Sequence, residues 1–261
     1  MSRRRQHLGQ QERHAQLLAL LRREGTVRIA TLAKVFDVTT ETARRDLDEL
    51  AAAGALKRTY GGGASRSLID EPGIGVRDRA RATERGLIAS AAARIVEPGD
   101  ALMIDCGSTT SAFANALAAR HLHLTVVTNC LPVAHALSTN AHCRVILCPG
   151  DYVSREAGTF GMDTVEFVAK FKANKAFIGA GGLGPDGVTD ADSKGCSIKR
   201  AMMQRSDRTI LLLDSSKYDL MHFERICALA DIDTLVSEAA PPKRLATSLK
   251  GSGVQVALAK A

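Results

Sequence analysis

The chain has 261 residues, of which 45% are hydrophobic and 24% charged, a composition typical of a globular protein with one large or two modest cores. No apolar stretch approaches the ~20 residues of a membrane helix. The start, MSRRRQHLGQQERHAQ, also lacks the apolar segment of a signal peptide. These features argue against a membrane-spanning or secreted protein, and we expect a cytoplasmic location.

The net charge of +7 is concentrated near the N-terminus. Residues 1–66 hold 13 Lys and Arg against 7 Asp and Glu, whereas residues 67–261 hold 22 against 21. A basic segment attached to a nearly neutral body is typical of a nucleic-acid-binding module joined to a second domain. Aromatic residues, on which single-stranded RNA is usually stacked, make up only 4% of the chain, so double-stranded DNA is the favoured partner.

The cysteine pattern predicts free thiols. No C-x-x-C pair and no paired Cys/His spacing occurs, so we expect neither a metal site nor a cofactor. The six cysteines are Cys106, Cys130, Cys143, Cys148, Cys196 and Cys227. A redox role for Cys106 is the alternative, because this residue stands beside a Gly-Ser-Thr turn and a helix start lowers the pKa of a thiol.

Three helices are predicted in the basic segment. Residues 11–25, QERHAQLLALLRREG, and residues 29–38, IATLAKVFDV, carry apolar side chains at helical spacing, and Gly25 can stop the first helix. The third helix begins in TTETARRDLDELAAAG, where Thr39 or Thr40 can cap its start and Gly54 can end it.

The third predicted helix has the pattern of a recognition helix. Ala43, Leu47 and Leu50 are spaced i, i+4 and i+7 and form its core-facing side. Side chains that remain exposed near its start can reach base edges in the major groove, and an arginine fork can bond a guanine or a phosphate. These exposed side chains are Thr40, Thr42, Arg44 and Arg45.

A solvated surface is the alternative interpretation of this helix, in which both arginines pair with acidic residues four positions away, Glu41 and Asp48. The segment ALKRTYGGGA, which follows, favours the DNA-binding interpretation. It is a short strand with Lys57 and Arg58 and then a glycine run that permits a tight turn, as in a wing that reaches the DNA backbone.

The run VTTETARRDLDELAAAGALKRTYGGGA closely resembles the N-terminal signature of the DeoR family of bacterial transcription regulators, in which Val-Ser-x-x-Thr-Ile-Arg-Arg-Asp-Leu leads to a Gly-Gly-Ala wing. Thr39 replaces the usual Ser and Ala43 replaces the usual Ile. Thr39 can still cap the helix, and Ala43 remains an apolar core residue. The resemblance implies a winged helix-turn-helix that contacts operator DNA. The implied DNA-binding residues are Thr40, Thr42, Arg44, Arg45, Lys57 and Arg58.

The remainder of the chain is predicted to form an α/β domain. SRSLIDEPGIG, residues 65–75, has no sustained period and is interpreted as a linker between domains at residues 1–64 and 76–261. One helix is expected from Val76 until Pro98-Gly99 breaks it. Near-continuous apolar runs then alternate with helices and favour a mostly parallel sheet covered on both faces. The runs are ALMID, TVVT, RVILC, KAFIG, TILLLD and a weaker VQVAL.

The candidate ligand-binding residues follow these runs, because ligands of open parallel sheets bind beyond the carboxyl ends of the strands. Glycines permit close approach, hydroxyls and helix-start amides bind phosphate, and Asp105 and Asn129 suit sugar hydroxyls. Taken singly, the Gly-Ser-Thr-Thr turn could be only a helix cap, Asp214 a turn residue and Lys217 a surface lysine. The predicted effector-binding residues are Asp105, Gly107, Ser108, Thr109, Thr110, Thr128, Asn129, Gly181, Asp214 and Lys217.

Four motifs of this region, DCGSTT, VVTNC, CPGDY and DSSK, are similar to motifs of the DeoR family, although Pro149 stands where the third motif usually has Gly. The resemblance covers residues 12–238. It implies a sensor domain that resembles ribose-5-phosphate isomerase and binds a phosphorylated sugar or polyol. An isomerase needs carboxylates for proton transfer, and Asn174 and Lys175 stand where we expect an acidic pair, which favours loss of catalysis.

The resemblance therefore implies a DNA-binding repressor of a sugar or polyol operon that a phosphorylated sugar releases from its operator. An isomerase-like enzyme with an accessory DNA-binding domain is the alternative. Because one helix-turn-helix reads only a short site, a homo-oligomer, either a dimer or a tetramer, is expected.

Overall fold

The structure, a computed structural model, describes residues 8–24, 26–52, 55–64 and 73–260. Its contacts divide the chain into two compact units, Met1–Asp70 and Glu71–Ala261, called here the N-terminal and C-terminal units. The predicted helix ends at Gly25 and Gly54 and most of the predicted linker, residues 65–72, lie outside the described residues.

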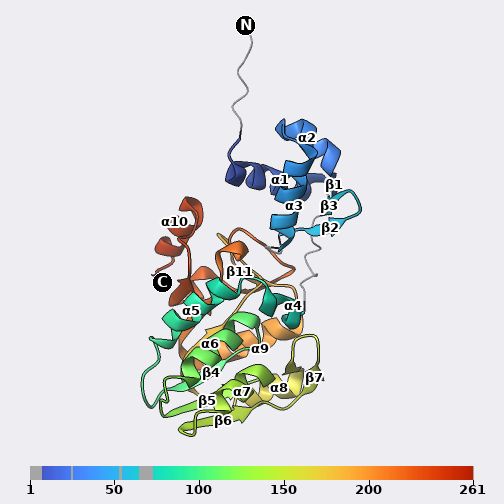
Figure 1. Cartoon of the computed structure of the whole chain (residues 1–261). Helices are drawn as coiled ribbons and strands as arrows, with labels where there is room; N and C mark the ends of the chain where they lie inside the picture. The colour runs from blue at the N-terminus through green and yellow to red at the C-terminus, as the bar shows by residue number, and fades with distance from the viewer. Residues whose placement is uncertain (1–7, 25, 53–54, 65–72, 261) are drawn as a thin grey trace. The chain divides into compact units, whose positions relative to one another are not determined.

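The N-terminal unit combines three helices with a three-stranded antiparallel sheet of order β1-β3-β2 (Figure 1). Its elements are α1 (Gln10–Glu24), β1 (Thr26–Arg28), α2 (Ile29–Phe36), α3 (Thr40–Ala52), β2 (Lys57–Thr59) and β3 (Gly62–Ala64). The three helices and the hairpin confirm the prediction. Strand β1 was not predicted, because a three-residue strand with only Val27 buried carries almost no periodic signal.

The core of this unit is formed by apolar side chains from all three helices. It contains Leu17, Leu21, Val27, Leu32, Phe36, Ala43, Leu47, Leu50 and Leu56. Thr39 caps α3, since its hydroxyl accepts a hydrogen bond from the Thr42 amide at 3.1 Å. A glycine is required at Gly62, where a Cβ would overlap the carbonyl oxygen of Val27 in the neighbouring strand.

A buried carboxylate ties α1 to α3. Asp46 accepts two hydrogen bonds from Arg13, at 2.8 and 2.9 Å, and lies 3.1 Å from Nε2 of His14. Burial alone would raise the pKa of Asp46, but the bonds with Arg13 and His14 outweigh it and lower this pKa below its ordinary value. Asp46, which belongs to the motif quoted above, therefore fixes the orientation of α3 within its unit.

The C-terminal unit is built on a seven-stranded parallel sheet of order β15-β14-β12-β9-β4-β5-β6. The strands are β4 (Ala101–Ile104), β5 (Leu124–Thr128), β6 (Cys143–Leu147), β9 (Ala173–Ile178), β12 (Ser206–Leu212), β14 (Thr234–Ser237) and β15 (Gln255–Leu258). All six predicted runs form strands of this sheet. Strand β14 was not predicted, because the short run TLVS lies among polar and acidic residues.

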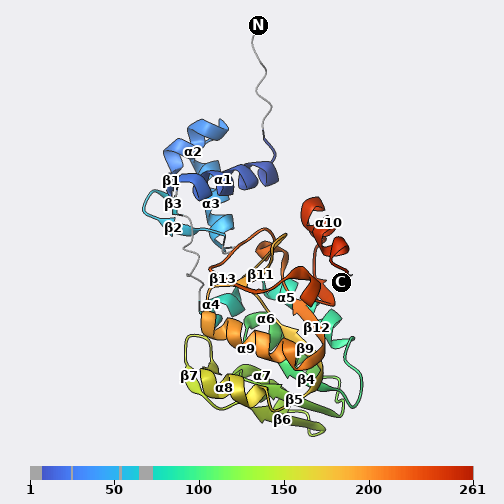
Figure 2. The same cartoon turned by 180° about the vertical axis from the view of Figure 1, so that it is seen from behind.

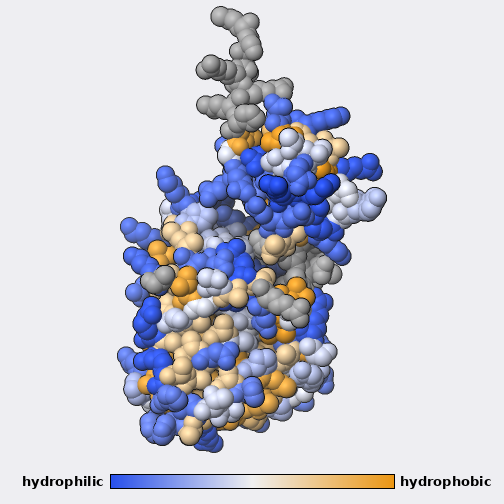
Figure 3. All heavy atoms as spheres, viewed as in Figure 1, coloured by the Kyte–Doolittle hydropathy of each residue, from blue (hydrophilic) through white to orange (hydrophobic). Residues whose placement is uncertain are grey.

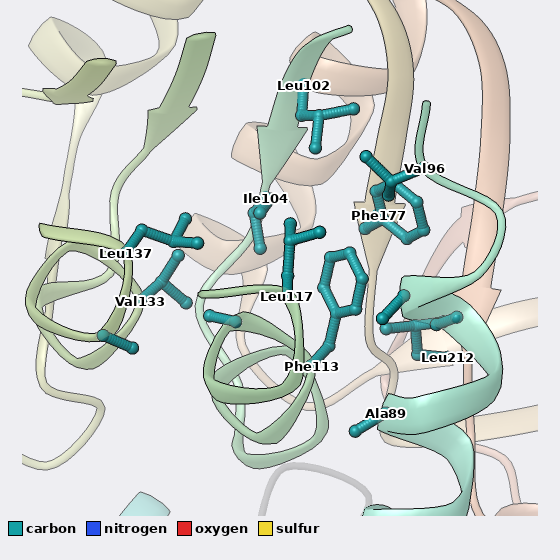
Figure 4. Close-up of a cluster of buried hydrophobic side chains, with 14 of the residues drawn as sticks. Ala89, Val96, Leu102, Ile104, Phe113, Leu117, Val133, Leu137, Phe177 and Leu212 are labelled. Carbon is teal, nitrogen blue, oxygen red and sulfur yellow. The ribbon is translucent and has the colours of Figure 1, made fainter. Parts of the chain in front are cut away.

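Helices cover both faces of this sheet, as Figures 1 and 2 show from opposite sides. The helices are α4 (Ile74–Arg79), α5 (Ala82–Ala93), α6 (Ser108–Ala118), α7 (Leu131–Ser138), α8 (Met162–Val168), α9 (Ser193–Gln204) and α10 (Lys243–Gly251). Helices α5, α6 and α7 pack on one face through a cluster that includes Leu102, Phe113 and Phe177 (Figure 4). Helices α8, α9 and α10 pack on the other face, where Met103 and Leu211 point.

The prediction of one continuous helix from Val76 to Pro98-Gly99 is wrong. The segment forms two helices, α4 and α5, because Arg81 adopts a left-handed backbone conformation with φ 53° and its guanidinium binds carboxylates elsewhere in the unit. The second helix ends at Ala93, five residues before Pro98.

Short antiparallel strands and two 3-10 helices complete the C-terminal unit. They are the hairpin β7 (Asp151–Val153) and β8 (Gly158–Phe160), the sheet of β10 (Gly182–Gly184), β11 (Gly187–Asp190) and β13 (Glu224–Cys227), and the 3-10 helices η1 (Ser215–Lys217) and η2 (Leu229–Asp231). Among the described residues, no helix is both long and apolar enough to cross a lipid bilayer.

Candidate functional site

The start of α3 presents the predicted DNA-binding side chains to solvent. Thr40, Arg44 and Arg45 are exposed and Thr42 is half-buried, whereas Ala43 and Leu47 are buried on the opposite side of the helix. Hydrophilic side chains cover much of the face of this unit shown in Figure 3. The sequence pattern therefore separated the buried face of α3 from its exposed face correctly.

The two arginines of α3 share one acidic partner. Glu41 lies 3.2 Å from Nη1 of Arg44 and 3.7 Å from Nε of Arg45, and all three side chains are more than half exposed. The pairing of Arg44 with Asp48 that the alternative interpretation requires is not formed, since Asp48 binds Arg58 at 2.7 Å. Exposed pairs contribute at most about 1 kcal/mol, so both guanidinium groups can exchange Glu41 for DNA phosphates or bases.

The hairpin β2–β3 has a fixed base and an exposed tip. Arg58 binds Asp48 and donates to the carbonyl oxygen of Gly62, so this side chain holds the hairpin, whereas Lys57 is exposed. Tyr60 at the tip is fully exposed, and Gly61 turns the chain with φ 78°. Sequence analysis missed Tyr60, although an aromatic residue between a basic strand and a glycine run was the available signal.

In the C-terminal unit, the order of the strands reverses between β4 and β9. Strands β4, β5 and β6 extend the sheet in one direction, and β9, β12, β14 and β15 extend it in the other. In open parallel sheets the crevice at such a reversal is where ligands bind. Asp105 follows β4 and Gly179 follows β9, and the Gly179 amide donates to Oδ1 of Asp105 at 3.1 Å. The predicted Asp105 therefore stands at this reversal, and the carboxyl ends of β4 and β9 with the turns that follow them are called the crevice here.

Asp105 belongs to a buried charged triad that sequence analysis missed in part. Nζ of Lys199 on α9 lies 3.1 Å from Oδ2 of Asp105 and 3.0 Å from Oδ2 of Asp190. Burial alone would lower the pKa of Lys199, but the two carboxylates outweigh it and raise this pKa well above its ordinary value. Burial raises the pKa of Asp105. Lys199 lies on the buried face of α9. A lysine among the apolar positions of this helix was the signal in the sequence that could have identified it.

One acceptor oxygen near this crevice has no partner among the described residues. It is Oδ1 of Asn129, whereas Oδ2 of Asp105 is ion-paired with Lys199 at 3.1 Å. Asn129 uses its amide nitrogen to donate to the carbonyl oxygen of Thr159 at 2.9 Å, so its oxygen remains available. A buried acceptor without a donor is costly, and a ligand hydroxyl would satisfy it.

The Gly-Ser-Thr-Thr turn opens α6 as predicted. Gly107 is the residue before the helix, and its carbonyl oxygen accepts hydrogen bonds from the hydroxyls of Thr110 at 2.9 Å and Ser111 at 2.8 Å. Within the described part of the chain, the hydroxyls of Ser108 and Thr109 have no hydrogen-bond partner. These two hydroxyls and the amides of the first helical turn are free to bind an anion, whereas Thr110 stabilises the turn itself.

The other predicted residues are divided between the crevice and the scaffold. Thr128 donates to the carbonyl oxygen of Ile104 at 2.7 Å and so joins β5 to β4. Gly181 packs against the ring of His222, since a Cβ at this position would lie 2.7 Å from the ring. Asp214 caps η1 through the Ser216 amide at 3.1 Å and binds Arg81, and Lys217 ends the same turn.

Two further expectations are corrected by the structure. Asn174 and Lys175 lie at the start of β9, at the opposite edge of the sheet, where Asn174 accepts from the Ala101 amide and Lys175 binds Asp100. Their identities therefore say nothing about catalysis in the crevice. The redox role of Cys106 finds no support, because the neighbouring Cys130 thiol and burial raise the pKa of the Cys106 thiol far above its ordinary value.

The two units match two sequence profiles of one family. The profile described as DeoR-like helix-turn-helix domain matches residues 13–67, and that described as DeoR C terminal sensor domain matches residues 80–239. The chain belongs to the DeoR family. The resemblance identified from the sequence motifs is thereby confirmed, and this DeoR protein is a DNA-binding transcriptional regulator with a small-molecule sensor domain.

Several similar proteins are named as transcriptional repressors. The HTH-type transcriptional repressor CsqR of Escherichia coli (strain K12) is 31% identical over 247 residues, which cover 94% of each chain. The Glycerol-3-phosphate regulon repressor of the same organism is 31% identical over 250 residues, 95% of this chain and 99% of that one. The HTH-type transcriptional repressor GlcR of Bacillus subtilis (strain 168) is 27% identical over 248 residues. This DeoR protein is therefore a regulator and not an enzyme.

Solved structures support the fold assignment. The tetrameric eIF2B-beta2-delta2 complex from C. thermophilum aligns with a TM-score of 0.50 and 14% identity over 95% of this chain and 91% of that one. The ribose 5-phosphate isomerase A from Methanocaldococcus jannaschii aligns with a TM-score of 0.37 and 15% identity over 51% of this chain and 53% of that one. The first likeness concerns the fold alone, and the second is too remote to support an argument about activity.

Proposed function

We propose that this DeoR protein is a repressor that binds paired operator half-sites as a homo-oligomer and is released when a phosphorylated sugar or polyol binds in the crevice of its C-terminal unit. The observation that carries the proposal is the buried Oδ1 of Asn129, an acceptor without a donor among the described residues, beside the carboxylate of Asp105 and a helix start with free hydroxyls. Acceptors of this kind suit sugar hydroxyls, and the helix start suits a phosphate.

DNA binding is assigned to the exposed side chains of α3 and the wing. Arg44 and Arg45 extend from the first half of α3, with Thr40 and Thr42 beside them, as in a recognition helix in the major groove. Lys57 and the hairpin tip approach the backbone, and Arg58 supports them by holding the hairpin to Asp48. One such module reads a short site, so tight and specific binding needs two modules in one assembly.

Effector binding is assigned to both sides of the reversal between β4 and β9. Ser108, Thr109 and Lys217 supply hydroxyls, amides and a positive charge for the phosphate. Gly107, Gly181 and Asp214 shape the turns around them, and Thr110 and Thr128 stabilise the crevice from behind. The name of one relative, the Glycerol-3-phosphate regulon repressor, supports a small phosphorylated polyol as one member of the effector class.

Operator binding in the presence of phosphorylated compounds tests the proposal. An operator is first selected from random DNA with the full-length protein, and its affinity is measured by fluorescence anisotropy. Glycerol 3-phosphate, ribose 5-phosphate and glucose 6-phosphate are then added separately, with inorganic phosphate and the unphosphorylated compounds as controls. At least one phosphorylated compound should weaken operator binding by about 5-fold or more, the lower range of typical allosteric coupling.

A matched pair of variants connects this release to the crevice. Asp105→Asn should bind the operator normally but lose its response to the active compound, whereas Asp207→Asn, which changes an exposed aspartate at the start of β12, should respond like the original protein. Indifference of the original protein to every phosphorylated compound tested would overturn the release mechanism.

A further inference from the structure

The segment that enters the C-terminal unit is held by charged contacts from two directions. Helix α4 follows residues 65–72, through which the chain arrives from the N-terminal unit, and six residues are too few for a helix to be stable by itself. Its start is fixed by the Ile74 amide, which donates to the carbonyl oxygen of Arg155 at 2.9 Å, and Arg77 binds Glu156 in the same β7–β8 turn. Helix α4 therefore depends on its surroundings for its position.

Arg81, two residues after the end of α4, binds three carboxylates of the C-terminal unit. Its Nη2 atom lies 3.1 Å from Glu238 and 3.1 Å from Glu84, and its Nε atom lies 3.2 Å from Oδ1 of Asp214. The backbone of Arg81 is left-handed, with φ 53° and ψ 39°, which is uncommon for a residue with a side chain and is maintained only where surrounding contacts enforce it. These ion pairs supply that enforcement.

The carboxylates that hold Arg81 also shape the η1 turn. Asp214 accepts hydrogen bonds from the amide and hydroxyl of Ser216, at 3.1 and 2.5 Å. Glu238 accepts from the amide and hydroxyl of Ser215, at 3.1 and 2.5 Å. A phosphate that binds at this turn repels both carboxylates and attracts the guanidinium of Arg81, so the arrangement of charges around Arg81 cannot be the same with and without it.

The other side of the crevice reaches α4 as well. Cys106, which follows Asp105, donates from its thiol to the carbonyl oxygen of Glu156 at 3.0 Å, and the carboxylate of Glu156 binds Arg77. The α6 turn is therefore connected to α4 through Cys106 and Glu156. The η1 turn is connected to the end of α4 through Asp214 and Arg81.

We propose that Arg81 is a positioning residue that couples occupancy of the crevice to the placement of α4, and through α4 to the DNA-binding unit. This inference rests on the proposed effector binding at the η1 turn. It requires that the effector favour one arrangement of Arg81 and its three carboxylates over another, because a ligand shifts an equilibrium only by its difference in affinity for the two states.

The test uses the full-length protein and separates coupling from binding. Operator affinity is measured with and without the most active compound of the panel above, and compound binding is measured by thermal stabilisation. Arg81→Ala should bind the compound within about 2-fold of the original protein, but the compound should change its operator affinity by less than about 2-fold, against about 5-fold or more for the original protein. Arg81→Lys, which keeps the charge but cannot bridge several carboxylates, should lie between them.

Arg200→Ala is the matched control. It removes an arginine from an ion pair with Glu224 in the same unit, away from α4, and should keep the full response. A full response in Arg81→Ala would overturn the inference alone. Loss of compound binding in Arg81→Ala would also overturn it, because Arg81 would then be a ligand contact.

Hydrogen exchange tests the same contacts without any ligand. Amides of residues 74–79 should exchange several-fold faster in Arg81→Ala than in Arg200→Ala, because the chain directly after α4 loses its ion pairs, whereas Arg85 still binds the carbonyl oxygens of Arg77 and Ala80 in both variants. Equal exchange in the two variants would overturn the inference even where the original protein responds to a phosphorylated compound. If no compound changes the operator affinity of the original protein, the proposed release mechanism fails. Failure of the inference about Arg81 differs from this, because it appears only in the comparison of the variants.

Discussion

The two units of this DeoR protein differ in the exposure of the charged side chains at their candidate sites. In the N-terminal unit, Arg44 and Arg45 share the exposed Glu41 and face solvent. In the C-terminal unit, Lys199 lies between Asp105 and Asp190, and all three side chains are nearly inaccessible. Exposed pairs are weak and exchange easily for a polyanion, whereas buried pairs define a rigid crevice. The difference supports the proposal that the exposed arginines of α3 contact DNA and that Asp105 belongs to the effector site.

The largest effect is expected from removing the buried cation. Lys199→Met leaves two carboxylates facing each other without a counter-charge and should destabilise the C-terminal unit by about 3–5 kcal/mol. Chemical denaturation followed by circular dichroism measures this change. Lys172→Met, which breaks the exposed pair with Asp207, is the control and should cost less than about 1 kcal/mol. Equal effects of the two variants would contradict the contrast between buried and exposed charges.

Among the described residues of the N-terminal unit, Asp46 and its partner Arg13 differ from the exposed charges because their side chains are largely inaccessible. Asp46→Asn should destabilise this unit by about 2–3 kcal/mol, because Arg13 loses a buried bidentate partner. Since the pKa of Asp46 is lowered in the folded unit, the stabilisation it provides is present above the unfolded pKa of roughly 4 and disappears as the pH falls through the folded value.

Denaturation of the original protein and of Asp46→Asn at several pH values checks this sign. The difference in stability between them should be full at pH 7 and shrink in acid. Asp48→Asn, which changes an exposed aspartate in the same helix, should show a difference of less than about 1 kcal/mol at pH 7. A difference that grows in acid would mean that Asp46 is not bound as a carboxylate.

A smaller effect, on DNA binding alone, is expected for the exposed arginines. Arg45→Ala should weaken operator binding by about 1–3 kcal/mol without changing the unfolding temperature, because its only partner among the described residues is the exposed Glu41. Anisotropy with operator and with random DNA measures whether the loss is specific. A uniform loss would make Arg45 a phosphate contact, and Arg244→Ala on α10 serves as the exposed control.

The smallest effect concerns the wing. Tyr60→Ala should leave stability unchanged, because the side chain is fully exposed, and should weaken operator binding by about 1 kcal/mol through loss of a contact with the sugar-phosphate backbone. Lys34→Ala, an exposed change on α2, is the control. Unchanged operator affinity in Tyr60→Ala would show that the wing tip does not reach the DNA.

The sequence predicted local features well and distant partners poorly. The exposed face of α3 and the residues that follow each parallel strand depend on spacing within about ten positions, and both were found. Lys199 and Arg81 were missed, because their partners lie far away in the chain and only folding brings them together. Asn174 was misplaced for a related reason, since the apolar run KAFIG did not show which of its ends faces the crevice.

The order of the strands in the C-terminal sheet has a consequence for synthesis on the ribosome. Strands β4, β5 and β6 pair in the order in which they emerge, and β9, β12, β14 and β15 then add one after another on the other side of β4. Each strand therefore finds a neighbour that is already made, which suits folding from the N-terminus. Asp105 is an exception, because its ion-pair partner Lys199 is synthesised about 90 residues later. Its carboxylate therefore has no counter-charge until α9 is made and packed.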